Sequence, residues 1–572
     1  MKNILYISCF LLVTMAVMAL MKAGQERPAP ALQMRDIMGC APAPDGAVKL
    51  KDNGKFISVL PGWGSHGYDI STGNDSARFY FNQGLTMYYG YHMKEALASF
   101  KEATRFDTTC AMLYWGQALA MGPTYNGGYA YSMSREVPAL IERMNQYAGT
   151  ATGKEKELIA VMNTRYDVHD LSDGKRKQLN LDYANAMQLL NTRYPGDTEI
   201  LSLYIDAMML AHPWDFWNND GTPKSWTPEL VQLCESVLQK DPQHPAGLHY
   251  YIHLTEASRK PEVALPAADS LRVLFPGIAH MVHMSSHQYE RIGHFEKGVQ
   301  VNDQAGRSLE EYARLEKELS LMTRSSHYYA VGTYCAMSGA MYEEAMRKAN
   351  MIREVVDPSH DNTYEQYLYM FPVLTKVRMG KWQEILDDTT VIPGDWTYAN
   401  ILDNFSKGMA YAKTGSSRKA EKCLKVLKQL ATDVILKKRF VPHMSSPYEC
   451  TVIAENLLSA NISFAKGKRE AAVKAAEAAI AAEDKLIYTE PKLWMLPARQ
   501  YLGAFLLQMN RAADAEIAYR EDLQWNPGHG WSLLGLHQAL QQQKKYDELE
   551  RVKQQYELSF SGASVFPSAS AY

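Results

Sequence analysis

Two short segments in the middle of the chain carry side chains that can bind a metal ion. In each segment the donors recur every three or four residues, so they project from one face of a helix. Imidazole and carboxylate donors suit zinc, iron, manganese or copper. The donors are His249, His253 and Glu256 in GLHYYIHLTEAS, and His280, His283 and His287 in AHMVHMSSHQYE.

The two segments stand at equivalent positions of a sequence repeat. His249 and His283 are 34 residues apart, and so are His253 and His287, and this is the period of a helical-hairpin repeat. Pro242 closes one unit and Pro276 closes the following unit. Both segments are therefore predicted to be first helices of consecutive hairpins. First helices line the concave groove of such arrays. The donors are therefore expected to meet in one groove.

The preceding unit offers a carboxylate at the same height. His253 and His287 stand at the same distance after the prolines that close the preceding units, and the same count from Pro195 leads to Asp206. Asp206 is therefore expected beside His253 and His287 on the neighbouring first helix. A metal-bound water of lowered pKa fits such a mixture of imidazole and carboxylate donors. We therefore consider Asp206 and Glu256 as ligands or general bases of a metal-dependent hydrolase or oxidoreductase that uses iron, copper or zinc.

Five further residues are candidates for the rim of the groove. His212 ends the Asp206 segment, and His327 begins the next predicted first helix. Glu490, Trp494 and Arg499 could reach an organic substrate if the array curls back on itself, or could simply brace two helices.

The bulk composition limits the classes of partner. The chain has 572 residues and a formal net charge of -3, from 60 basic and 63 acidic residues, and it has no basic stripe. We therefore expect no nucleic-acid partner. Its widely spaced cysteines form no zinc-ribbon or disulfide framework, and no phosphate loop, GxSxG or HExxH sequence is present.

The N-terminus resembles a secretory signal. A basic Lys2 precedes an uncharged apolar run that ends near Met21, followed by small residues. We expect residues 1–24 to be cleaved and the protein to reach the periplasm or cell envelope. An uncleaved anchor is the alternative, and it would be the only membrane contact. Cys40 is either an acylation site or an ordinary linker cysteine.

From residue 76 onward the sequence resembles the tetratricopeptide (TPR) repeat family. Paired amphipathic helices recur, with small residues where helices cross and the family pattern W-x2-L-G near the C-terminus. The residues that carry this resemblance are Gly84, Ala96, Phe100, Leu502, Gly503, Ala515, Pro527, Trp531, Leu534 and Gly535.

The resemblance implies an all-α, TPR-type helical-hairpin solenoid, a right-handed superhelix preceded by an irregular N-terminal segment. We divide the chain into a signal segment at 1–24, a linker and irregular cap at 25–75, an N-terminal array at 76–310 that carries the histidines, a C-terminal array at 311–560 and a tail at 561–572.

The chain also resembles a group of exported bacterial TPR proteins. The residues that carry this likeness include HYYIHLTE, HMVHMSSHQY, HPWDFW and YTEPKLWMLPARQYLG. The group has no settled activity, so the resemblance implies a fold more than a function. Members have a histidine three residues before His327, where this chain has Arg324.

Two hypotheses follow. In the first, the protein is an exported metalloprotein whose histidines bind one or two ions. In the second, it is a non-enzymatic TPR scaffold of the cell envelope whose groove binds a peptide or a small organic or anionic ligand, and the histidines are recognition groups or structural hydrogen-bonding groups. Ligands must lie about 2 Å from a metal ion, so histidines that converge on a point favour the first hypothesis, and histidines spread along the groove favour the second.

Overall fold

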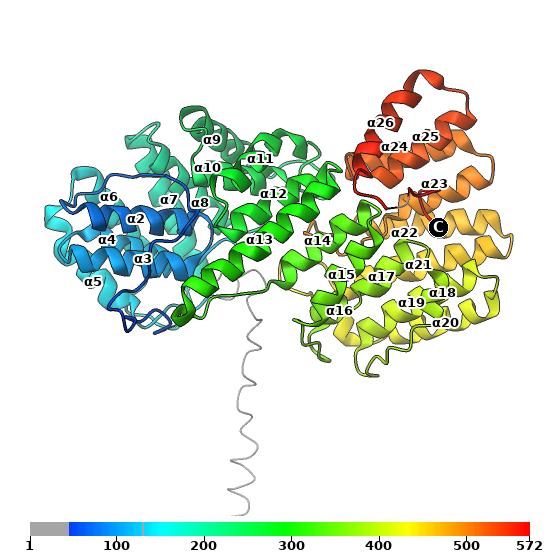
Figure 1. Cartoon of the computed structure of the whole chain (residues 1–572), viewed down its shortest axis with the longest axis horizontal. Helices are drawn as coiled ribbons and strands as arrows, with labels where there is room; N and C mark the ends of the chain where they lie inside the picture. The colour runs from blue at the N-terminus through cyan, green and yellow to red at the C-terminus, as the bar shows by residue number, and fades with distance from the viewer. Residues whose placement is uncertain (1–44, 128–130, 565) are drawn as a thin grey trace, which may run out of the picture. The chain divides into compact units, whose positions relative to one another are not determined.

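The chain folds as a succession of antiparallel α-helix pairs (Figure 1). This computed structural model describes residues 45–127, 131–564 and 566–572. Within these ranges the regular structure is helical, apart from one isolated bridge between Trp217 and Pro223. The all-α prediction is therefore confirmed. The predicted signal segment 1–24 and Cys40 lie outside the described residues.

The helices before the histidine cluster are α2 (Asp75–Tyr89), α3 (Met93–Phe106), α4 (Ala111–Ala120), α5 (Val137–Tyr147), α6 (Gly153–Thr164), α7 (Arg176–Arg193), α8 (Thr198–Ala211) and α9 (Thr227–Lys240). The middle helices are α10 (Pro245–Thr255), α11 (Leu265–Leu274), α12 (Ala279–Arg291), α13 (Phe295–Leu315), α14 (Ser326–Ser338) and α15 (Tyr342–Arg353). The remaining helices are α16 (Thr363–Tyr369), α17 (Phe371–Arg378), α18 (Trp382–Leu386), α19 (Thr397–Lys413), α20 (Ser417–Leu430), α21 (Pro447–Ala465), α22 (Arg469–Glu483), α23 (Ala498–Gln508), α24 (Ala512–Trp525), α25 (Gly530–Gln542) and α26 (Leu549–Ser559).

Small residues let the paired helices approach closely, as in TPR units. The Phe100 ring of α3 lies between Gly84 of α2 and Gly116 of α4, where an added Cβ would come within 2.9 and 2.5 Å of the ring. Near the C-terminus, the Tyr519 ring of α24 lies in the same way between the glycines of α23 and α25. An aromatic side chain of the second helix thus fills the space left by glycines on the two flanking first helices.

The first helices of the middle units lie next to one another. Helix α8 contacts α10, α10 contacts α12, and α12 contacts α14, while α9, α11 and α13 form the second layer. Pro245 begins α10, where its missing N–H costs nothing, and the His244 side chain accepts the Gly247 N–H at the same end. The predicted side-by-side order of the histidine helices is therefore confirmed.

The segments outside the arrays are partly ordered. The first described helix begins at Asp75, and residues 45–74 form no helix. The predicted boundary at 310 falls within α13, which continues to Leu315. In the predicted tail, the Tyr572 ring packs edge-on against Trp531. The described residues belong to one compact unit, and none of their helices is long and apolar enough to cross a bilayer.

Two glycines fix the contact between the α12–α13 turn and the loop before α25. Gly293 has a φ of +79°, and a Cβ there would lie 2.0 Å from the Gly528 carbonyl oxygen; Gly528 has a φ of +71°, and its Cβ would lie 2.1 Å from the Ile292 oxygen. This backbone-to-backbone approach leaves no room for a side chain.

We predict that Gly293→Ala lowers the free energy of unfolding by about 3 kcal/mol, because it combines left-handed strain with a backbone clash. Gly415 is the matched control, since it has a φ of +82° and nothing within 4 Å of its Cβ. Gly415→Ala should cost only about 1 kcal/mol. Urea unfolding of both variants measures the difference, and equal losses would show that the contact does not matter.

Candidate metal centre

The first group of convergent histidines joins α10 to α12. His249 and His253 of α10 and His280 of α12 have ring nitrogens that all lie within 4.8 Å of one another. All three side chains are buried, at 0 to 2% exposure. We call these residues the first triad.

The second group joins α12 to α14. His283 and His287 of α12 and His327 of α14 have ring nitrogens within 4.8 Å of one another, and all are buried. We call these residues the second triad. His327, which the sequence offered only as an outlying candidate, is thus brought to the cluster.

The two triads follow one positional rule. His249 and His253 are the fifth and ninth residues of α10, and His283 and His287 are the fifth and ninth residues of α12. The third member of each triad, His280 or His327, is the second residue of the next first helix. The paired triads are therefore two copies of one structural unit.

Hydrogen bonds fix the tautomers in the first triad. The His249 Nδ1 lies 2.6 Å from the Tyr89 carbonyl oxygen, and the His253 Nδ1 lies 3.1 Å from Glu256 Oε1. Because both partners are acceptors, each Nδ1 donates its proton and each Nε2 carries a lone pair. Both Nε2 atoms are buried and make no hydrogen bond in the described structure.

In the second triad, two such lone pairs meet. The His283 Nδ1 donates to Asn302 Oδ1 at 2.7 Å, and the Asn302 amide is itself oriented by donating to the Gly298 carbonyl at 2.8 Å. The His287 Nδ1 donates to Glu256 Oε2 at 2.8 Å. The two Nε2 atoms then face each other at 2.9 Å. Two lone pairs at this distance repel unless a proton or a metal ion lies between them.

A proton does not fill this role at physiological pH, because burial opposes protonation of the rings. Burial lowers the pKa of His253 to about 3 and the pKa values of His287 and His327 to about 4. The rings are therefore neutral at physiological pH, which is the state that binds metals. Two nitrogens about 2.05 Å from one ion are 2.9 Å apart when they subtend roughly 90°. The geometry of the second triad fits shared ligation.

The triads are neighbours rather than separate sites. The ring centroids of His280 and His283 are 6.1 Å apart, and those of His253 and His287 are 6.3 Å apart. Six imidazoles offer three ligands to each of two ions, and each ion keeps open coordination positions for a substrate or water.

Glu256 connects the triads. Its carboxylate accepts from His253 on one oxygen and from His287 on the other, and its side chain is buried. A carboxylate that holds the second nitrogen of a ligating histidine is a common support of metal sites. The structure thus gives Glu256 a positioning role toward both triads, beside its predicted role as ligand or base.

Glu490 reaches the cluster from the segment between α22 and α23. Its Oε2 lies 3.9 Å from the His287 Nδ1, and it forms a further group of candidate ligands with Glu256 and His287. Burial raises the pKa of Glu490 well above its usual range. The segment that carries Glu490 therefore lies against the histidines, as it must if Glu490 is to reach a substrate bound there.

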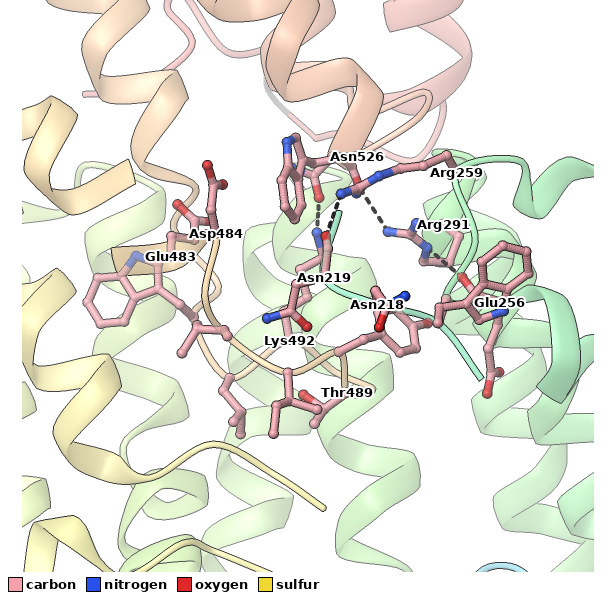
Figure 2. Close-up of a pocket in the computed structure, with 18 of the residues that line it drawn as sticks. Asn218, Asn219, Glu256, Arg259, Arg291, Glu483, Asp484, Thr489, Lys492 and Asn526 are labelled. Carbon is pink, nitrogen blue, oxygen red and sulfur yellow. Dashed lines mark hydrogen bonds between the residues drawn. The ribbon is translucent and has the colours of Figure 1, made fainter. Parts of the chain in front are cut away.

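A cavity of about 120 Å³ opens beside the first triad. His253 and Glu256 line one end, and Trp494 and Arg499 line the wall built by the later helices. Figure 2 shows Arg259 and Arg291 on one side of this pocket and Glu483 and Asp484 on the other. Of the six triad histidines, His253 is the one that lines this pocket.

Two predicted site residues lie elsewhere. Asp206 accepts from the Tyr88 hydroxyl at 2.6 Å and the Tyr250 hydroxyl at 3.2 Å, and it belongs to none of the described groups of candidate ligands. His212 stacks on Trp226 at 3.8 Å between ring centroids. Neither residue joins a triad in this structure.

Sequence reasoning missed the groups that orient and cover the triads. Asn302 lies on the second-layer helix α13, and Tyr89 is the last residue of α2; neither carries a sequence pattern that marks it. Aromatic rings cover the first triad: Tyr91 lies 4.7 Å from His249, and Tyr125 lies 4.9 Å from His253, between ring centroids. The histidines are therefore buried rather than exposed in an open groove.

A similar group nearby has the opposite tautomer. His66, Glu199 and His244 also lie within 4.8 Å of one another. However, the His244 Nδ1 accepts the Gly247 N–H, so its proton lies on Nε2, which faces Glu199. Burial opposes a charge on His66, but the Glu199 carboxylate outweighs it and raises the pKa of His66. This group is an ion-pair network and not a set of free lone pairs.

Comparison with known proteins identifies neither a family nor a function. Scans of the sequence against family models and against curated proteins return no match.

Solved structures with some likeness include a human IFIT1 dimer with m7Gppp-AAAA, with a TM-score of 0.29 and 11% identity over 87% of this chain and 92% of that chain. Yeast Tom70 has a TM-score of 0.27 and 10% identity over 84% of this chain and 92% of that chain. The P58(IPK) TPR domain has a TM-score of 0.17 and 15% identity over 59% of this chain and 93% of that chain. Scores this low carry no argument, and the TPR-like fold follows from the helix pairing itself.

We predict that Glu256→Gln weakens metal binding by about 10- to 100-fold, because a glutamine has only one acceptor oxygen for two imidazole N–H groups. Asp206→Asn is the matched control, since Asp206 is a buried acid on the adjacent first helix outside both triads. Competition with a chromophoric chelator measures both affinities. Equal losses in the two variants would show that the carboxylate at 256 has no special role.

Proposed function

We propose that the protein binds two transition-metal ions, one in each histidine triad, and acts as an exported metal-dependent oxidoreductase on a small organic molecule in the adjoining pocket. The observation that carries this proposal is the convergence of buried histidine nitrogens in two triads, with the Nε2 atoms of His283 and His287 only 2.9 Å apart. Purely structural histidines would each have a hydrogen-bond partner on both ring nitrogens, whereas the Nε2 atoms of His249, His253 and His327 have none among the described residues.

The charge of the site favours copper. Imidazole suits zinc, iron and copper, but all six ligands are neutral, and among the described residues the carboxyl groups that share a group of candidate ligands with them are those of Glu256 and Glu490. Two divalent ions would bring four positive charges into a buried region, and uncompensated buried charge is costly. Two Cu(I) ions would bring half of that charge. As one-electron donors, a pair of them also suits reactions with dioxygen.

The convergence also bears on the scaffold hypothesis. A peptide-binding groove would have its recognition groups spread along the first helices, whereas these histidines gather at two neighbouring points and are buried. Protein binding by other surfaces of a TPR-like array is compatible with the metal centre, but no feature of the histidine cluster favours it.

Export is part of the proposal. The resemblance to exported bacterial TPR proteins and the apolar run after Lys2 support it. We predict that the protein recovered from the envelope fraction of its host lacks about the first 24 residues. Intact-mass spectrometry measures this, and a full-length mass in the membrane fraction would instead support an anchor.

We predict about two copper ions per chain in the purified protein and a loss of both in the His253→Ala, His287→Ala double variant, which removes one ligand from each triad. His327→Ala should lose only the ion of the second triad and retain about one. Elemental analysis after reconstitution with each candidate metal measures these ratios.

The control is His360→Ala, because His360 is exposed and lies far along the chain from the triads. It should retain the wild-type metal content. Zinc in place of copper would redirect the proposal toward hydrolysis, and a wild-type protein that binds no metal after reconstitution would contradict it.

A further inference from the structure

A buried arginine faces the pocket without a carboxylate partner. Arg291 donates to three carbonyl oxygens, those of Glu256 at 2.9 Å, Ser258 at 3.0 Å and Trp525 at 2.9 Å. Among the described residues no acidic oxygen lies within 4.0 Å of its guanidinium nitrogens, although it is only 4% exposed. Carbonyl groups orient this cation, and the carboxyl groups of Glu256, Glu290 and Glu490 act on it only from beyond ion-pair distance.

A second arginine lies beside the first. Arg259 donates to the Asn219 carbonyl at 2.8 Å and stacks on the Trp525 ring at 3.6 Å. Burial and the nearby charge of Arg291 lower the pKa of Arg259. In the described part of the chain it too forms no ion pair. Two like charges at one end of a pocket are stabilised by an anion that both can contact.

The acidic groups at the other side of the pocket are already engaged. Asp484 forms a two-point pair with Arg499, at 2.6 and 2.8 Å. Glu483 accepts the Ala498 N–H, and burial raises its pKa to about 7. Figure 2 shows these acids on the side of the pocket away from Arg259 and Arg291. The arginines are therefore left for a ligand.

The rest of the pocket wall is largely aromatic. The rings that line it include those of Trp214, Trp217, Tyr488, Trp494 and Trp525. Flat aromatic faces favour a planar ligand, which can stack on them in an offset or edge-on arrangement. The wall reaches His253 of the first triad at its inner end.

We propose that this pocket binds a small aromatic carboxylate, with its carboxylate against Arg259 and Arg291 and its ring along the aromatic wall toward His253. The aromatic carboxylate is also the substrate class that we assign to the oxidoreductase, and that part of the inference rests on the proposed function. Its binding in the pocket does not require the metal ions. Guanidinium groups bind carboxylates through paired charge-assisted hydrogen bonds.

The test is calorimetric titration of the full chain with 4-hydroxybenzoate and with 4-hydroxybenzamide, which have the same ring and differ in charge. The carboxylate should bind at least about tenfold more tightly than the amide. Arg259→Ala should remove most of this preference, whereas Arg324→Ala should keep it. Arg324 is an exposed arginine that pairs with Glu354 outside the pocket. Arg259 is partly exposed, so its truncation should be tolerated by the fold.

The metal-poor His253→Ala, His287→Ala variant separates the two proposals. Carboxylate preference retained in that variant and lost in Arg259→Ala supports the pocket. Carboxylate preference lost in the histidine variant but kept in Arg259→Ala would mean that the ligand binds the metal, and would overturn this inference while leaving the metal centre in place. Equal affinity for both compounds, or binding of neither, would also overturn it.

Discussion

The carboxylate of Glu256 lies between two sets of histidines and accepts a hydrogen bond from one ring of each. The backbone carbonyl of the same residue accepts from Arg291, and Arg291 in turn donates to the Trp525 carbonyl at the end of α24. One residue therefore connects the first triad, the second triad and the later helices that form the pocket wall. A change at this position alters the orientation of two ligands and the position of a buried cation together.

Burial determines the chemistry of the site. In water each imidazole would have solvent on both nitrogens and would gain a proton near its ordinary pKa of about 6.5. Enclosed by Tyr91, Tyr125 and the segment that carries Glu490, the rings stay neutral, and the buried Nε2 atoms of His249 and His253 make no hydrogen bond among the described residues. Each unpaired buried polar atom costs on the order of 1–3 kcal/mol, so the fold carries a penalty here that ligation of a metal ion would remove. A site that is destabilising when empty is the expected form of a binding site.

The sequence predicts the helices and the ligands better than it predicts the groups that hydrogen-bond to the ligands. The 34-residue period and the spacing of three or four residues were sufficient to place five histidines on adjacent first helices. Asp206 shows the limit of this reasoning. It is the ninth residue of α8, as His253 is of α10, but the Tyr88 hydroxyl of α2 occupies its carboxylate. A hydrogen bond between residues so distant in sequence depends on how the layers pack, and no local pattern reports that.

The repeat also explains why there are two triads and not one or three. A triad needs imidazoles at the fifth and ninth positions of one first helix and at the second position of the next. On α8 the fifth and ninth positions are Ser202 and Asp206, and on α14 they are Ala330 and Tyr334.

The rule is thus satisfied only by the α10–α12 and α12–α14 steps among these four helices. Helix α12 belongs to both steps, so its His280 faces back to α10 while His283 and His287 face α14. Because one helix supplies ligands to both sites, the two sites must be neighbours. The close spacing of the triads is therefore a consequence of the repeat itself, and a pair of ions there would be held together by the same packing that builds the array.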